Sequence, residues 1–326
     1  MSFGKQETKR RPSTNGYLSS IEFERQPGLG YVNRTGFRPG TPSHFWDHPV
    51  TNHCFALAVS PENAPFIMNG SLVCIKSIRI TNPGVPIVVL HTGLSERQKE
   101  SFGSVTFIEI SPEFGISDFS SATRPDVLDA TFLKLYVDKI EDFDTVIYVD
   151  GDAVVLEKLD DLFNLDVPFA AGFRDGYPLS EQFERGHELL ASEGLSEDYA
   201  FNAGVMRYDL RFWRTRSLSG EALVLCQSHG WNAFRFADQS LLNLIVRKES
   251  ALTPISRLYN FCRWPDMLRQ EHKVVANDQG LFAPAVAEGT AKIVHWNGPV
   301  KPWSREAITS AESPISYCLE CYDQFL

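Results

Sequence analysis

Residues 145–152 read Thr145-Val146-Ile147-Tyr148-Val149-Asp150-Gly151-Asp152, and this stretch decides the fold and the place of a site. Its first five residues form a short, β-branched apolar run, which is typical of a buried strand. Two carboxylates therefore follow a strand's carboxyl end. Residues i and i+2 of an extended chain point to the same side, so Asp150 and Asp152 can converge on one cation, while Gly151 lets a ligand approach the backbone. Carboxylate oxygens are the ligands of a hard metal ion.

Apolar strands alternate with amphipathic helices from Cys54 onward. This alternation predicts an α/β fold with a Rossmann-like, mostly parallel sheet covered by helices on both faces. Ligands of such sheets bind beyond the carboxyl ends of the strands, where Asp150 and Asp152 stand. The predicted strands are Cys54–Val59, Pro86–Leu90, Val105–Ile110, Thr145–Val149 and Pro168–Ala171, and the predicted helices are Asn69–Ile80, Asp126–Ile140, Asp209–Ser228 and Asp238–Val246.

The composition excludes several classes of function. The chain has 326 residues, of which 43% are hydrophobic and 22% charged, so it can bury a sizeable core. Its net charge of −10 argues against nucleic-acid and membrane-surface partners, because both require a basic face. No apolar run approaches the length of a transmembrane span, and the first residues lack the apolar core of a signal peptide. We therefore predict a cytoplasmic protein.

Two segments differ from the rest of the chain. Residues 1–50 are rich in proline and glycine and lack sustained periodicity, which predicts a flexible or surface-draped arm ahead of a single domain over 51–326. Residues 174–199 are polar and helix-prone, and predict an insertion beside the site. The six dispersed cysteines are predicted to be mostly reduced core residues: Cys54, Cys74, Cys226, Cys262, Cys318 and Cys321.

Later motifs gain weight only in company with the two aspartates, because a strand followed by Asp-x-Asp is by itself more often a solvated strand end. Phe201-Asn202-Ala203-Gly204 and Asp238-Gln239 taken alone are ordinary turn and helix-capping sequences. His295 follows a strand-like run, and its imidazole is either packed in the core or completes a metal site. Lys301 is either a surface lysine or the partner of an anion bound at the same metal.

In combination and in this order, the motifs resemble family 8 glycosyltransferases, which include glycogenin, galactinol synthase and bacterial lipopolysaccharide galactosyl- and glucosyltransferases. The resemblance covers roughly Cys54 to Trp303. The matching stretches are Asp150-Gly151-Asp152, Phe201–Val205, Asp238-Gln239 and His295–Trp303, with Phe132–Leu135 and Asp160–Phe163 in addition. It implies a GT-A fold, a UDP-glucose or UDP-galactose donor, a Mn²⁺ ion with Mg²⁺ as the alternative, and retention of anomeric configuration.

The resemblance also implies a role for each matched residue. Lys301 would neutralise the diphosphate, and Gln239 would lie near the anomeric carbon. The implied metal ligands are Asp150, Asp152 and His295. The implied donor-binding residues are Asp150, Asp152, Lys134, Asn202, Asp175, Gly298 and Lys301. The implied catalytic residues are Asp238, Gln239 and Lys301.

The predicted function is metal-dependent, retaining transfer of a hexose from a UDP-sugar to a hydroxyl acceptor. The acceptor is left open as a saccharide, a polyol, a lipid-linked glycan or a protein, and so is a homodimer. We expect residues 174–199 to select the acceptor rather than take part in the chemistry. Two alternatives are a haloacid-dehalogenase-like phosphotransferase, whose Asp-x-Asp follows the first strand of its domain, and a nucleotide-sugar-binding protein without catalysis.

Overall fold

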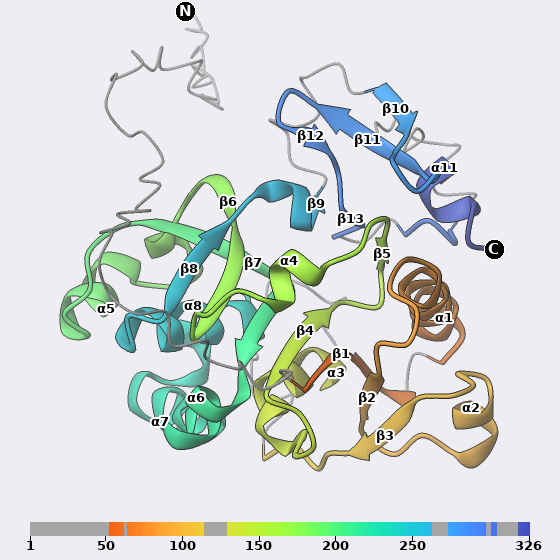
Figure 1. Ribbon diagram of the computed structural model, residues 1–326. Coiled ribbons are helices and arrows are strands. Elements are labelled where there is room, and N and C mark those ends of the chain that lie inside the picture. The colour runs from red at the N-terminus through yellow and green to blue at the C-terminus, as the bar shows by residue number, and fades with distance from the viewer. Residues whose placement is uncertain (1–51, 62–63, 114–128, 263–272, 298–300, 305–318) are drawn as a thin grey trace, which may run out of the picture. The chain divides into compact units, whose positions relative to one another are not determined.

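The computed structural model describes residues 52–61, 64–113, 129–262, 273–297, 301–304 and 319–326, apart from the side chains of 64–68, 129 and 173–176. Its centre is a seven-stranded sheet with the order β3-β2-β1-β4-β7-β6-β8 (Figure 1). The strands are β1 (His53–Val59), β2 (Ile87–His91), β3 (Thr106–Glu109), β4 (Thr145–Val149), β6 (Phe169–Pro178), β7 (Tyr199–Asp209) and β8 (Leu252–Ile255). The predicted arm lies outside the described residues, so the division into arm and single domain stays a prediction.

The sheet is mostly parallel, as predicted. Strands β3, β2, β1 and β4 run parallel to one another, and β8 runs parallel to β6. Strand β7 is antiparallel to both of its neighbours, β4 and β6. Such a sheet places the carboxyl end of β4, and with it Asp150, at the edge where ligands of α/β proteins bind.

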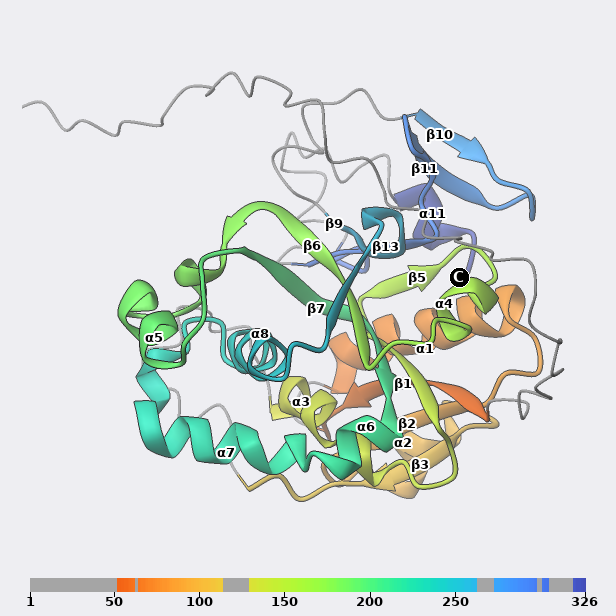
Figure 2. The same ribbon diagram turned by 60° about the vertical axis from the view of Figure 1, so that its left-hand side comes forward.

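Helices cover both faces of the sheet (Figures 1 and 2). One face carries α1 (Ala64–Thr81) and α4 (Asp160–Phe163). The other face carries α3 (Asp129–Phe132), the 3₁₀ helix η3 (Leu133–Lys139), α6 (Leu210–Thr215), α7 (Leu218–His229) and α8 (Asp238–Lys248). Helix α2 (Glu96–Glu100) precedes β3 and begins with a capping box between Ser95 and Gln98.

Strand β4 shows why its sequence is apolar without alternation. Val146 and Tyr148 belong to the core on the α8 side, whereas Ile147 and Val149 belong to the core on the α1 side. All four side chains are buried. A strand that is covered on both faces must be apolar at consecutive positions, and this explains the run that precedes Asp150.

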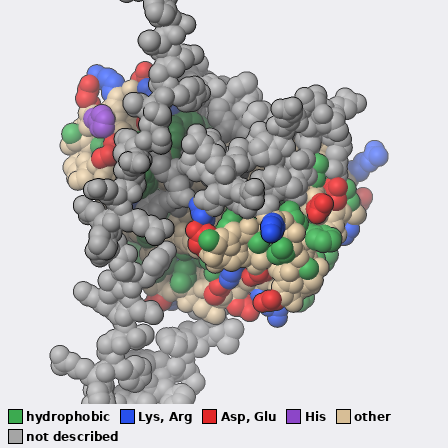
Figure 3. All heavy atoms as spheres, turned by 90° about the horizontal axis from the view of Figure 1, so that it is seen from above, with side chains coloured by type: hydrophobic (Ala, Val, Ile, Leu, Met, Phe, Trp, Pro, Cys, Tyr) green, Lys and Arg blue, Asp and Glu red, His purple; other side chains and the backbone are tan. Residues whose placement is uncertain are grey.

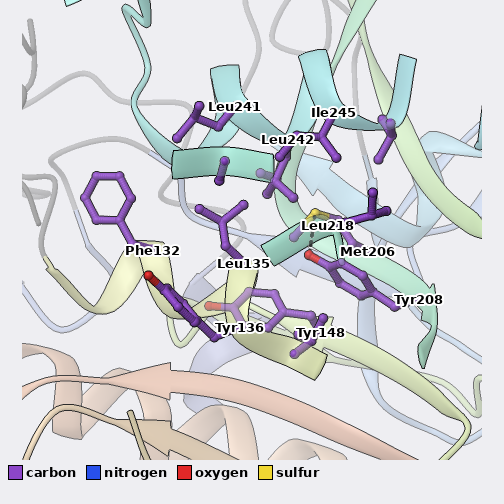
Figure 4. Close-up of a cluster of buried hydrophobic side chains, with 14 of the residues drawn as sticks. Phe132, Leu135, Tyr136, Tyr148, Met206, Tyr208, Leu218, Leu241, Leu242 and Ile245 are labelled. Atoms are coloured by element: carbon purple, nitrogen blue, oxygen red, sulfur yellow. Dashed lines mark hydrogen bonds between the residues drawn. The ribbon is translucent and has the colours of Figure 1, made fainter. Parts of the chain in front are cut away.

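The single helix predicted over Asp126–Ile140 is wrong in form. Residues 126–128 are outside the described part, and the rest divides into α3 and η3. The carbonyl of Lys134 accepts from Tyr208 Oη at 3.2 Å, and that of Leu135 accepts from Trp213 Nε1 at 3.2 Å. These side chains take up carbonyls that an α-helix would use internally. Phe132, Leu135, Tyr136 and Ile140 are buried in the core on the α8 side, and Figure 4 labels the first three of them.

The helix predicted over Asp209–Ser228 is two helices, α6 and α7. Ser217, between them, is left-handed, with φ 53° and ψ 40°. Trp213 and Leu218 are both buried in the same core. In one continuous helix, residues five positions apart point about 140° away from each other. The break at Ser217 therefore lets both side chains face the core.

Strand β7 was not predicted, and β6 is longer than Pro168–Ala171. The polar residues Asn202 and Arg207 obscure the apolar pattern of β7, although both are buried. Arg207 donates to the Val167 carbonyl and, at 3.4 Å, to Thr145 Oγ1, and these hydrogen bonds offset part of the cost of its burial. Strands β6 and β7 remain paired as far as Pro178 and Tyr199. The excursion between them holds the 3₁₀ helix η4 (Leu179–Gln182) and α5 (Gly186–Ser192).

Two small sheets follow the main one along the chain. One has the order β5-β13-β9, with β5 (Ala153–Val155), β13 (Ile293–His295) and β9 (Phe261–Cys262). The other has the order β10-β11-β12, with β10 (Lys273–Ala276), β11 (Phe282–Val286) and β12 (Gly289–Thr290). The short helices η5 (Trp231–Ala233), η6 (Arg257–Asn260) and α11 (Leu319–Asp323) complete the described elements.

Surface and cysteines agree with the composition. Acidic, basic and apolar side chains are interspersed over the described surface seen in Figure 3. Within the described ranges, no helix has both the length and the apolar composition needed to cross a membrane. Cys54, Cys74, Cys226, Cys262 and Cys321 are free and buried, as predicted, and Cys318 lies outside the described residues.

The left-handed break between α6 and α7 generates a stability prediction. Ser217 is exposed and makes no side-chain cap, so Ser217→Gly should raise the free energy of unfolding by about 1 kcal/mol through relief of backbone strain. Thr215→Gly, at an exposed helical position of α6, is the matched control and should lower it by a similar amount. Urea denaturation measures both, and a loss of stability in Ser217→Gly would contradict the strained break.

Candidate active site

Three predicted metal ligands meet at the carboxyl end of β4. Asp150 and Asp152 lie in the turn between β4 and β5, and His295 ends β13, whose residue 295 pairs with Ala153. His295 Nε2 lies 3.2 Å from Asp152 Oδ1 and 3.8 Å from Asp150 Oδ2. One ligand atom from each residue can be chosen so that all three lie within 4.8 Å of one another. This spacing suits three ligands of one cation after a small adjustment.

A hydrogen bond on the side away from the carboxylates orients the imidazole of His295. Its Nδ1 lies 3.0 Å from Asn260 Oδ1, and Asn260 Nδ2 in turn donates to Asn202 Oδ1 at 2.9 Å. The Nδ1–H therefore donates to Asn260, and Nε2 faces the carboxylates. Burial alone would lower the pKa of His295, but Asp152 and the Cys262 thiol raise it to about 10. The carboxylates that hold a proton on Nε2 are placed to hold a cation there instead.

Asp152 is the most strongly stabilised carboxylate of the cluster. Burial would raise the pKa of Asp152, but Lys301 and His295 lower it well below its usual range. Lys301 Nζ is ion-paired with Asp152 and donates to the Trp296 carbonyl at 3.0 Å. The Trp296 N–H donates to the Asp152 carbonyl at 3.0 Å, so the segment after β13 is joined directly to the aspartate turn. A positive side chain thus stands beside the cluster, as predicted.

Two glycines of the motifs are explained by packing. A Cβ at Gly204 would lie 2.1 Å from His295 Cε1, so only glycine lets β7 pass the imidazole. A Cβ at Gly151 would lie 2.3 Å from Ser71 Oγ of α1. We expected Gly151 to leave room for a ligand. The structure corrects this, because the space beside Gly151 is filled by α1.

Lys134 is buried between two aspartates. Its Nζ lies 3.0 Å from Asp150 Oδ1 and 3.1 Å from Asp238 Oδ2, and it donates to the Ala203 carbonyl at 3.1 Å. Burial alone would lower the pKa of Lys134, but the two carboxylates raise it. An ammonium has three N–H groups, and all three are directed at these acceptors. These contacts position Asp150 and Asp238, and the predicted contact of Lys134 with the donor sugar stays a prediction.

Asp238 and Gln239 begin α8. Burial raises the pKa of Asp238, and Asp150 adds to this while Lys134 opposes it. Gln239 Oε1 accepts from Asn202 Nδ2 at 3.1 Å and from the Ala203 N–H at 3.3 Å. The preceding residue, Ala237, is buried and has φ 47° and ψ −115°, a strained conformation for alanine. The helix thus starts abruptly, with both polar residues turned toward β7.

The remaining predicted residues lie outside what the structure describes. The backbone of Asp175 belongs to β6, but its side chain is outside the described part, and Gly298 is outside it altogether. Sequence reasoning missed three residues that the structure brings to the site, namely Asn260, Cys262 and Gln182. The parallel pairing of β9 with β13 sets Cys262 beside His295, at 3.4 Å from Sγ to Nδ1. No local pattern signals this, since the pairing joins distant segments.

Comparison with known proteins adds the family. Residues 37–307 match the sequence model of "Glycosyl transferase family 8". The chain belongs to this family. The family 8 member is 27% identical over 179 residues to lipopolysaccharide 1,2-glucosyltransferase of Escherichia coli (strain K12), which covers 54% of this chain and 49% of that protein. It is 24% identical over 296 residues to glycogenin-2 of Homo sapiens, covering 88% of this chain and 51% of that protein. The chain thus spans about half the length of both relatives.

Solved structures share the fold. An active-site mutant of LgtC superposes with a TM-score of 0.61 at 20% identity, covering 83% of this chain and 94% of that chain. Galactosyltransferase LgtC in complex with donor and acceptor sugar analogs gives a TM-score of 0.59 at 21% identity, with coverages of 82% and 95%. The predicted α/β fold of GT-A type is confirmed.

The close approach of β7 to His295 generates a prediction about cation binding. Gly204→Ala should displace the imidazole and weaken Mn²⁺ binding by about tenfold or more, because the ligand geometry is lost. Gly172→Ala is the control, since its Cβ would meet Asn260 Cβ at an ordinary 3.7 Å. Titration calorimetry with Mn²⁺ measures both variants. Equal affinity in the Gly204→Ala variant would argue against His295 as a ligand.

Proposed function

We propose that this protein is a metal-dependent, retaining glycosyltransferase that moves glucose or galactose from a UDP-sugar to a hydroxyl acceptor. The observation that carries the proposal is the convergence of Asp150, Asp152 and His295 with Lys301 beside them, in a chain of family 8. The names of the relatives support a sugar transferase, since they include a lipopolysaccharide glucosyltransferase and a glycogenin. A saccharide, polyol, lipid-linked glycan or protein is the proposed acceptor.

A divalent cation fits the cluster by its chemistry. Two carboxylates and an imidazole suit Mn²⁺ better than Mg²⁺, which prefers oxygen ligands alone. Asn260 accepts from Nδ1 of His295, so Nε2, which faces the carboxylates, would be the ligand atom once a cation displaces its proton. When bound, such an ion supplies positive charge that stabilises the diphosphate as the bond to the sugar breaks.

Lys301 is proposed to neutralise the leaving diphosphate. The chain as a whole carries a net charge of −10, so negative charge on the leaving group must be met by local cations. Lys301 is about one-fifth exposed, whereas Lys134 is buried with all its N–H groups directed at protein acceptors. Of these two lysines, Lys301 is therefore the one with access to a ligand.

Asp238, Gln239 and Asn202 are proposed to face the donor sugar, with Asp175 as a further contact. Lys134 fixes the Asp238 carboxylate, and the backbone of β7 fixes the Asn202 and Gln239 amides. Transfer forms a bond from the acceptor oxygen to the anomeric carbon and breaks the bond from that carbon to the phosphate oxygen. With retention, the departing phosphate oxygen accepts the proton of the acceptor hydroxyl, so no separate carboxylate base is required.

The alternatives make different predictions. A haloacid-dehalogenase-like phosphotransferase has no support from the family or from the fold. A nucleotide-sugar-binding protein without catalysis would bind UDP-sugar and leave it intact. Turnover therefore separates this last alternative from a transferase.

The cation cluster generates a prediction about turnover. With UDP-glucose or UDP-galactose and Mn²⁺, slow release of UDP should be detectable without an acceptor, and EDTA should abolish it. Asp152→Ala should lower this rate at least ~100-fold, through the loss of about 3 kcal/mol of transition-state stabilisation. Asp278→Ala removes an exposed carboxylate elsewhere and should have no effect. Full activity in EDTA would exclude metal dependence.

Lys301 generates a second prediction. Lys301→Ala should lower the kcat of donor hydrolysis by roughly 10²-fold, because positive charge is lost at the leaving group. Lys301→Arg should restore only part of the rate, since a planar guanidinium does not replace a point charge in a tight loop. The exposed Lys273→Ala variant is the control. An unchanged kcat in Lys301→Ala would show that the loop containing Lys301 serves packing and not catalysis.

A further inference from the structure

The excursion between β6 and β7 reaches the reaction site through Gln182, the last residue of η4. Gln182 is fully buried. Its Oε1 accepts from Gln239 Nε2 at 3.2 Å. Its backbone carbonyl accepts from Ser240 Oγ at 2.8 Å and from the Arg235 N–H at 2.9 Å. The excursion is thus bonded to both sides of the start of α8. Its expected role in selecting the acceptor stays a prediction.

Backbone donors settle the orientation of each amide in this contact. The Ala203 N–H donates to Gln239 and the Gly204 N–H donates to Asn202, at 3.3 and 3.0 Å, so both side chains turn their oxygens toward β7. Gln239 must then direct its Nε2 toward Gln182, whose Oε1 accepts the hydrogen bond. One N–H of Gln239 is left for other partners.

The contacts form one chain of hydrogen bonds that all run in the same direction. His295 donates to Asn260, Asn260 to Asn202, Asn202 to Gln239, and Gln239 to Gln182. Amides linked in this way polarise one another. Gln182 is the last acceptor of this chain, so it holds the nitrogen end of the Gln239 amide while the backbone of β7 holds the oxygen end.

Burial of the Gln182 amide costs free energy, and packing alone does not explain why an amide occupies this position. Its Nε2 is buried and has no hydrogen-bond partner among the residues that the structure describes. An apolar side chain of similar length would fill the same space without an unpaired donor. The amide is explained if this position must supply an oxygen to Gln239.

We propose that Gln182 is a positioning residue for Gln239. By accepting one amide N–H of Gln239, Gln182 turns the other toward the donor sugar and ties the excursion to the reaction centre. This inference rests on the proposed function as far as turnover is concerned. The orientation of the Gln239 amide can be observed without turnover.

The first experiment is spectroscopic. The side-chain amide resonances of Gln239 are assigned in ¹⁵N-labelled protein by their loss in Gln239→Met. In Gln182→Met they should shift and exchange faster with solvent, because one N–H loses its acceptor. Glu181→Met, at the exposed neighbouring position, should leave them unchanged. Unchanged Gln239 resonances in a folded Gln182→Met protein would overturn the proposal, whether or not the protein hydrolyses UDP-sugars.

The second experiment is kinetic and uses Mn²⁺ with UDP-glucose and UDP-galactose. Gln182→Met should lower kcat about tenfold while the KM for the donor stays within about threefold, because positioning rather than binding is lost. The double variant with Gln239→Met should be no slower than Gln239→Met alone, since Gln182 acts through Gln239. Additive losses would show an independent, structural effect and overturn the proposal. If the wild type hydrolyses neither donor, the proposed function fails and the amide resonances decide the role of Gln182.

Discussion

The rest of the site depends on the buried ammonium of Lys134 and its contacts. It joins the turn after β4, the start of α8 and the backbone of β7 by contacts to Asp150, Asp238 and the Ala203 carbonyl. An isolated charge in this position would be very unfavourable, and removing one partner of a buried pair typically costs about 3–5 kcal/mol. Two acidic groups of like charge can therefore stand close together, one in the cation cluster and one at the start of α8.

A second constraint is the pairing of segments that are far apart in the chain. Strand β13 lies between β5 and β9, and its register places His295 opposite Ala153 and beside Cys262. The imidazole can approach β7 only because residue 204 is glycine. The site is thus built from two sheets: His295 ends a strand of one, and the turn that carries Asp150 and Asp152 is held between β4 and β5, which belong to different sheets. Such support is what keeps reacting groups in a fixed geometry.

Hydrogen-bonded amide side chains extend this fixed arrangement away from the cation cluster. The amides of Asn260, Asn202, Gln239 and Gln182 are bonded in series, and backbone N–H groups of β7 fix the orientation of the middle two. A buried polar network allows few alternative arrangements, because each misplaced donor leaves a partner unsatisfied. The excursion between β6 and β7, which we expect to select the acceptor, is thereby connected to the group proposed to face the sugar.

Local sequence determined the elements whose burial has a simple period. The run before Asp150 predicted β4, because a strand covered on both faces is apolar throughout, and the spacing of Asp150 and Asp152 predicted carboxylates on one side. Tertiary structure decided the rest. Strand β7 is hidden by Asn202 and Arg207, which are buried with partners such as Gln239 and the Val167 carbonyl that lie far away in the chain. The predicted helices break where Tyr208 and Trp213 take their carbonyls or where Ser217 turns left-handed. Which partners Lys134, Asn260 and Gln182 meet depends on strand register and crossing elements, and a local pattern encodes burial but not the identity of a remote neighbour.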